Sequence, residues 1–143
     1  MPQRAVFLDT SFVIALENKD DPHHARAKEL DGELLQQDAI LVFHWGILIE
    51  IADGFARLAR RDRGLELLAK LTSEAGYDVL PITEPLLQGA LDLYRARLDK
   101  EWSLTDCIFF VLMKWQGLTE ALTADNHFRQ AGFKALLLEA SGD

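Results

Sequence analysis

The sequence has 143 residues, of which 49% are hydrophobic and 27% charged, as is typical of one globular domain spanning residues 1–143. Its formal net charge of −8 argues against a general nucleic-acid binder, which would carry a broad basic face. There is no N-terminal signal pattern and no apolar run long enough to span a bilayer, and the single cysteine, Cys107, excludes an intrachain disulfide. We therefore expect a cytoplasmic protein with no membrane association.

The first half of the chain alternates between strand and helix patterns. Ala5–Leu8 is a short apolar run typical of a buried strand, and residues 11–16 are predicted to follow as a short helix. Residues 22–35 are predicted as a helix that begins with a proline, and residues 40–43 as a second strand. Apolar side chains recur at nearly helical spacing over residues 47–60, which predicts one helix there.

The second half continues this alternation. Helices are predicted over residues 65–74 and 84–98, and a third begins at Ser103. The third is apolar on almost every side, so we expect it to be buried at the centre of the domain. The remaining predicted elements are strands over residues 78–82, 120–123 and 134–138, and a short helical segment over residues 127–131. This order predicts an α/β fold, a three-layer α/β/α sandwich with a mostly parallel central sheet.

Four acidic residues occupy positions where such a fold places its ligands. Asp9 and Asp125 follow two of the predicted strands, and ligands of open α/β sheets bind beyond the carboxyl ends of the strands. Asp106 lies at the start of the apolar helix, and Glu50 lies one turn into the helix after the second strand. Four carboxylates at one sheet edge would repel each other, and Mg²⁺ or Mn²⁺ would relieve that repulsion and assist phosphodiester cleavage.

Each acid also has a purely structural interpretation. Asp9 is placed to cap the short helix after it, and Asp125 suits a turn. Asp106 stands three residues after Ser103, as in a capping box, and Glu50 alone reads as an exposed helix residue.

The densest basic cluster is formed by Arg57, Arg60, Arg61 and Arg63. It would either contact RNA phosphates or form a solvated helix end, and the sequence leaves both readings open. His127, two residues after Asp125, could reach the acidic site, but a packing or capping role is the preferred interpretation.

The strings around these acids resemble those of PIN-domain nucleases, and most closely the VapC-type toxins of bacterial toxin–antitoxin pairs. The matching strings, in chain order, are LDTS (8–11), DPHH (21–24), LIEIAD (48–53), SLTDC (103–107), ALTADNHF (121–128) and QAGF (130–133). The resemblance implies a metal-dependent endoribonuclease with Asp9, Glu50, Asp106 and Asp125 as catalytic, metal-binding carboxylates. Thr10 or Ser11 would be the supporting hydroxyl, and Mg²⁺ the cofactor, with Mn²⁺ as the alternative.

The same resemblance implies an RNA substrate, a cognate antitoxin protein that covers the site, and a homodimer. The sequence departs from the family pattern at His44-Trp45-Gly46, where relatives often have serine or threonine after the second strand. A catalytically silent PIN-like module that binds RNA or protein is the alternative function. A phosphatase using Asp9 as nucleophile is disfavoured, because Ser11 stands where its second aspartate is needed, and no phosphate-binding P-loop string is present.

Overall fold

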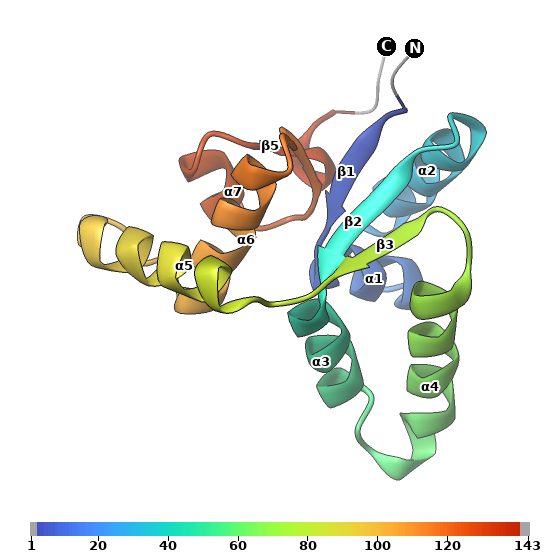
Figure 1. The fold of residues 1–143 in the computed structure, drawn as a ribbon. Coiled ribbons are helices and arrows are strands. Elements are labelled where there is room, and N and C mark those ends of the chain that lie inside the picture. Colours follow the sequence, from blue (N-terminus) through green and yellow to red (C-terminus); the bar gives the residue numbers. More distant parts are fainter. Residues whose placement is uncertain (1–2, 141–143) are drawn as a thin grey trace.

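The computed structural model describes residues 3–140, which form three layers with an all-parallel, five-stranded sheet in the middle (Figure 1). The strand order is β3-β2-β1-β4-β5, and each neighbouring pair runs parallel. The strands are β1 (Ala5–Leu8), β2 (Ile40–His44), β3 (Tyr77–Leu80), β4 (Glu120–Leu122) and β5 (Lys134–Ala135). The predicted α/β/α fold is therefore confirmed.

Helices cover both faces of this sheet (Figure 1). One side carries α1 (Thr10–Glu17), α2 (His24–Gln36) and α4 (Leu58–Ser73), and the other carries α5 (Glu84–Ala96), α6 (Leu104–Trp115) and α7 (Asn126–Gln130). The helix α3 (Trp45–Gly54) extends beyond the end of β2 and packs against α4 and α1. Within residues 3–140, no helix is both long and apolar enough to cross a membrane.

The central strand and the apolar helix α6 meet in an aromatic core. The Phe7 ring of β1 lies 5.2 Å from the Phe109 ring of α6, and Phe109 stacks on Phe128 of α7 at 6.0 Å. Phe110 makes an edge contact with Trp102 at 5.0 Å. The expected burial of α6 is confirmed for most of the helix, but Trp115 at its end is 55% exposed. Because these ring contacts anchor α6, they also fix the position of Asp106 in its first turn.

The prediction of a single helix over residues 47–60 is wrong, because the structure has two helices in this region. The helix α3 ends at Gly54 and α4 begins at Leu58, and the buried side chain of Phe55 lies in the turn between them. The backbone of Gly64 in α4 lies against Phe55, and a Cβ at Gly64 would lie only 2.7 Å from the Phe55 Cβ. Leu58 continues the apolar spacing yet is 86% exposed, so the spacing concealed the break.

The last predicted strand is also shorter than expected. β5 covers only Lys134–Ala135, and the chain continues as a 3₁₀ helix over Leu136–Leu138. The N–H of Leu137 donates to the Thr123 carbonyl at 3.2 Å, so the chain turns back over the end of β4 instead of extending the sheet. An apolar run of this length is compatible with either conformation.

The departure from the family pattern at His44-Trp45-Gly46 has a structural explanation. His44 occupies the N-cap of α3, where its Nδ1 accepts a hydrogen bond from the Gly46 N–H at 2.8 Å. Its ring is 1% exposed and lies 4.9 Å from that of Phe109, and burial lowers the pKa of His44 to about 4. The neutral imidazole thus performs the capping that a hydroxyl side chain usually performs.

This cap requires glycine at position 46. A Cβ there would lie 2.3 Å from His44 Cε1, and the buried ring has no room to move away. We expect Gly46→Ala to lower the free energy of unfolding by about 2 kcal/mol, in spite of the better helix propensity of alanine. Urea denaturation at pH 7.5 measures this change. The matched control is Gly32→Ala in α2, where a Cβ meets nothing within 4 Å and stability should rise by about 0.5–1 kcal/mol. A stabilising Gly46→Ala would contradict the capping role of His44.

Candidate active site

The structure brings the four predicted acids to one cleft at the carboxyl ends of the central strands. Asp9 directly follows β1 and Asp125 lies just beyond β4, and these two strands are neighbours in the sheet. Asp106 reaches the cleft from the first turn of α6, and Glu50 from α3. The cleft has a volume of about 400 Å³ and is also lined by Thr10 and Ser11.

Asp9 is the most buried of these acids, being 7% exposed. Its Oδ2 accepts hydrogen bonds from the hydroxyls of Ser11 at 2.7 Å and Thr123 at 2.8 Å. Asp9 occupies the N-cap position of α1 but makes no side-chain capping bond, so the capping interpretation fails for this residue. Burial raises the pKa of the Asp9 carboxyl above its usual 3.8, with a further contribution from Asp125. The ionised form of Asp9 is therefore held at an energetic cost.

Thr123 is a site residue that the sequence reasoning missed. Besides donating to Asp9, its Oγ1 accepts the Asp125 N–H at 3.0 Å and lies 3.3 Å from the Ser11 hydroxyl. Ser11 Oγ also accepts the Ala124 N–H at 3.2 Å. These hydroxyls tie Asp9 and Asp125 to one network across the two strands. The only sequence signal was that Thr123 follows an apolar run just before an acid.

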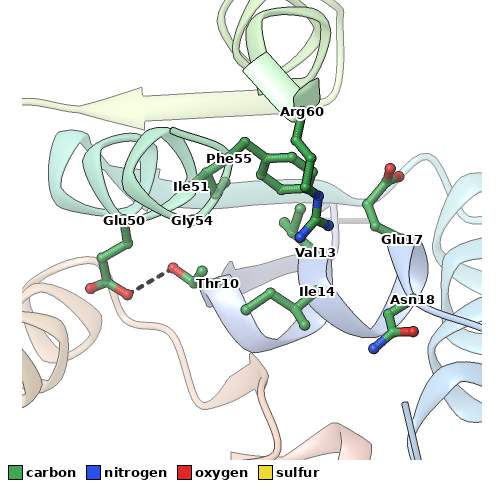
Figure 2. A pocket seen from close by; sticks show the side chains of 10 residues that line it. All are labelled: Thr10, Val13, Ile14, Glu17, Asn18, Glu50, Ile51, Gly54, Phe55 and Arg60. Atoms are coloured by element: carbon green, nitrogen blue, oxygen red, sulfur yellow. Dashed lines mark hydrogen bonds between the residues drawn. The ribbon is translucent and has the colours of Figure 1, made fainter. Parts of the chain in front are cut away.

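Glu50 and Thr10 form a second pair across the cleft. The Thr10 hydroxyl donates to Glu50 Oε2 at 2.9 Å, which joins the start of α1 to α3 (Figure 2). The pKa of Glu50 is raised above 4.5, first by partial desolvation of its carboxylate and then by the charges of Asp9 and Asp106. A carboxylate that other carboxylates destabilise is one that a cation would stabilise.

Asp106 both caps the start of α6 and lines the cleft. It forms a capping box with Ser103, whose N–H donates to Asp106 Oδ2 at 3.0 Å while Ser103 Oγ accepts the Asp106 N–H at 2.9 Å. The same Oδ2 lies 2.9 Å from His127 Nδ1. Asp125 Oδ1 caps α7 by accepting the His127 N–H at 2.9 Å. The capping-box interpretation of Asp106 is thus correct, whereas Asp125 caps a helix instead of forming a turn, and both side chains line the cleft.

His127 reaches the acidic residues, so the structure favours the alternative that the sequence analysis preferred less over a packing or capping role. Its Nδ1 lies 2.9 Å from Asp106 Oδ2 and 3.7 Å from Asp125 Oδ1. One ligand atom from each of these three residues falls within 4.8 Å of the others, a spacing that could hold a metal ion.

The basic cluster separates into different environments. Arg63 forms ion pairs with Glu17 at 2.6 Å and Glu66 at 2.9 Å, and Arg61 donates to the backbone carbonyl of Ala56. Arg57 is at the N-cap position of α4 and does not line the acidic cleft. Arg60 lines a second pocket that shares Thr10, Ile14 and Glu50 with the acidic cleft. Among the arginines expected to contact RNA, Arg60 is therefore the one that lies beside the acidic cleft.

The donor set of the cleft fits a hard divalent cation. All four acids offer carboxylate oxygens, which Mg²⁺ and Mn²⁺ both accept, and His127 adds a nitrogen next to two of them. Desolvation is the main cause of the raised pKa values of Asp9 and Glu50, and the negative charge of neighbouring carboxylates adds to it. A bound cation would offset that charge and hold an anionic group against the carboxylates.

Comparison with known proteins assigns this chain to a family. The chain belongs to the PIN domain family, whose model matches residues 6–134. The 23S rRNA-specific endonuclease VapC20 of Mycobacterium tuberculosis is 26% identical over 132 residues, which cover 90% of this chain and 95% of the relative. The crystal structure of that VapC20, described as a sarcin–ricin loop cleaving toxin, matches with a TM-score of 0.75 over the same shares of the two chains.

Two further solved structures share the fold at lower identity. FitAcB from Neisseria gonorrhoeae has a TM-score of 0.67 and 19% identity, covering 91% of this chain and 94% of its own. A toxin–antitoxin complex from Klebsiella pneumoniae has a TM-score of 0.60 and 16% identity, covering 85% and 87%. At these identities the likeness concerns the arrangement of strands and helices.

Proposed function

We propose that this protein is a metal-dependent endoribonuclease that serves as the toxin of a toxin–antitoxin pair. The observation that carries the proposal is the convergence of Asp9, Glu50, Asp106 and Asp125 on one cleft in a PIN domain. The 26% identity to a ribosomal RNA endonuclease over nearly the full chain supports RNA as the substrate. A silent binding module would not need to keep all four carboxylates, two of them at raised pKa.

The carboxylates of the cleft would hold Mg²⁺, or Mn²⁺ as the alternative, through their oxygens. When bound, the cation supplies Lewis-acid chemistry at the phosphodiester. Ser11 and Thr123 fix Asp9 by donating to its Oδ2, and Thr10 fixes Glu50 in the same way. His127 positions Asp106 through its contact with Oδ2. The protein thus orients its negative groups before substrate arrives, which lowers the cost of reaching the reactive arrangement.

The test is cleavage of total cellular RNA, including ribosomal RNA, by the purified chain. We expect discrete fragments with Mg²⁺ or Mn²⁺, and none with EDTA. A thermal melt in the same buffers should show the unfolding midpoint rising with metal concentration, because a ligand that binds only the folded state stabilises it. Folded protein that melts at the same temperature with and without metal, and leaves RNA intact, would favour the binding-module alternative.

We also propose that a small antitoxin silences the enzyme in the cytoplasm by placing an arginine or lysine side chain in the acidic cleft. Such a cation would find four carboxylates and would compete with the metal for them. A homodimer is part of the same proposal, and light scattering of the purified chain measures it. A monomeric mass at micromolar concentration would remove the dimer from the proposal without affecting the nuclease.

A further inference from the structure

A groove next to the acidic cleft has the features of a binding site for one nucleotide. It lies between α1, α3 and the start of α4, has a volume of about 280 Å³, and opens onto the cleft through their shared residues Thr10, Ile14 and Glu50 (Figure 2). One wall is apolar and consists of Val13, Ile14, Ile51 and Phe55. The polar end carries Asn18 and Arg60. We call this pocket the Arg60 groove.

Among the described residues that line this groove, Arg60 is the cation and Glu17 and Glu50 are the anions, with Glu50 accepting a hydrogen bond from Thr10. Both Glu17 carboxylate oxygens accept from Arg63 at 2.6 Å, and this contact lowers the pKa of Glu17. Within residues 3–140, Arg60 has no ion pair and no hydrogen bond from its side chain. Its guanidinium lies 4.8 Å from the centre of the Phe55 ring and points into the groove (Figure 2). A cation that forms no ion pair with any described residue therefore stands beside a cleft that is built for phosphodiester chemistry.

We propose that the Arg60 groove holds one unstacked nucleotide of the RNA, next to the bond that is cleaved. This inference rests on the proposed function. Arg60 binds the phosphate of that nucleotide, and the apolar wall contacts its base. Asn18 also lines the groove, where its Oδ1 accepts the Asp20 N–H and its amide NH₂ is the group left to contact the base edge. The groove thus accepts single-stranded or looped RNA, because a paired and stacked base cannot leave the helix to enter it without an energetic cost.

Two variants change the groove by different means. Arg60→Gln removes the cation and keeps a long polar side chain. Gly54→Leu adds a side chain to the lining while leaving Arg60 in place, and a Cβ at Gly54 meets nothing within 4 Å. Their matched controls lie on α2, outside the groove: Lys28→Gln removes one exposed positive charge, and Gly32→Leu adds the same side chain at an equally open helix position.

The measurement is single-turnover cleavage of a short RNA that contains the mapped site, as a function of enzyme concentration. We expect Arg60→Gln and Gly54→Leu each to raise the half-saturating concentration about tenfold, as befits one lost charge-assisted contact. Both controls should stay within about twofold. Arg60→Gln alone should also lower the slope of log affinity against log salt by about 0.7, the value for one phosphate contact on a single strand.

A second arm locates the base. An abasic nucleotide on one side of the cleaved bond should weaken binding to the wild type but add no further loss in Gly54→Leu. If the wild type cleaves RNA and both groove variants match their controls, the groove proposal is overturned while the nuclease proposal is kept. This result would be expected if the groove binds a protein segment instead of a nucleotide. If the folded wild type cleaves no RNA, the proposed function itself fails. Thermal melts show whether each variant is folded, and Arg60→Gln keeps the test decisive if Gly54→Leu unfolds.

Discussion

Asp9→Asn is expected to abolish metal-dependent cleavage and, at the same time, to make the protein more stable. Losing even an outer partner of a metal ligand costs about 10- to 100-fold in activity, so losing the carboxylate itself should cost more than about a hundredfold. The asparagine oxygen can still accept from Ser11 and Thr123, so the network around position 9 is kept. The buried negative charge, whose cost is seen in the raised pKa of Asp9, is removed.

The difference in the free energy of unfolding between Asp9→Asn and the wild type should depend on pH in a definite direction. Above the folded-state pKa of Asp9, the wild type carries the costly charge and the variant does not, so the variant is the more stable protein. As the pH falls through that raised pKa toward 3.8, the wild-type carboxyl becomes neutral and the difference should shrink to zero. Urea denaturation of both proteins in EDTA between pH 4 and pH 8 measures it. An Asp9→Asn protein that is less stable than wild type at pH 8 would mean that burial does not dominate at this site.

Asp106→Asn is expected to abolish cleavage to a similar degree but to lower stability. Asp106 lies in the first turn of α6, where a negative charge is favourable. It also accepts hydrogen bonds at one oxygen from the Ser103 N–H and contacts His127 there. The charge at a helix N-terminus contributes roughly 0.5–1 kcal/mol, so we expect a loss of that size.

The contrast between these two carboxylates is itself a test of the site. RNA cleavage and urea denaturation of both variants, measured in parallel at pH 7.5, should show equal losses of activity and opposite changes in stability. Equal changes in stability would show that helix capping does not distinguish Asp106 from Asp9. Retention of cleavage by either folded variant would remove that residue from the proposed metal site.

The sequence predicted the location of the site better than its internal connections. The fold was predictable because buried strands such as Ala5–Leu8 read as short apolar runs separated by helices. Asp9 and Asp125 were found because strand ends are where parallel sheets place their ligands. Asp106 was found because the apolar helix behind it had to be central.

What the sequence could not reveal depends on contacts between distant residues. Thr123 and Ser11 meet because β1 and β4 are neighbours, and nothing local marks a threonine as the partner of a residue 112 positions away. His127 turns toward Asp106 only after α7 has packed near α6. The break at Phe55 was concealed because its side chain is buried beside the groove, while the exposed Leu58 continues the apolar spacing.

The hydrogen bond from Thr123 to Asp9 joins positions 114 residues apart, and it forms only when β4 has paired with β1. Contacts between residues so far apart in the sequence form slowly, and this one requires the chain through Thr123. During synthesis, a growing chain that still lacks Thr123 and Asp125 cannot assemble the pocket, even though Asp9 and Glu50 were made much earlier. For an enzyme proposed to cut RNA, this order of assembly postpones activity until the ribosome has translated its message past Asp125.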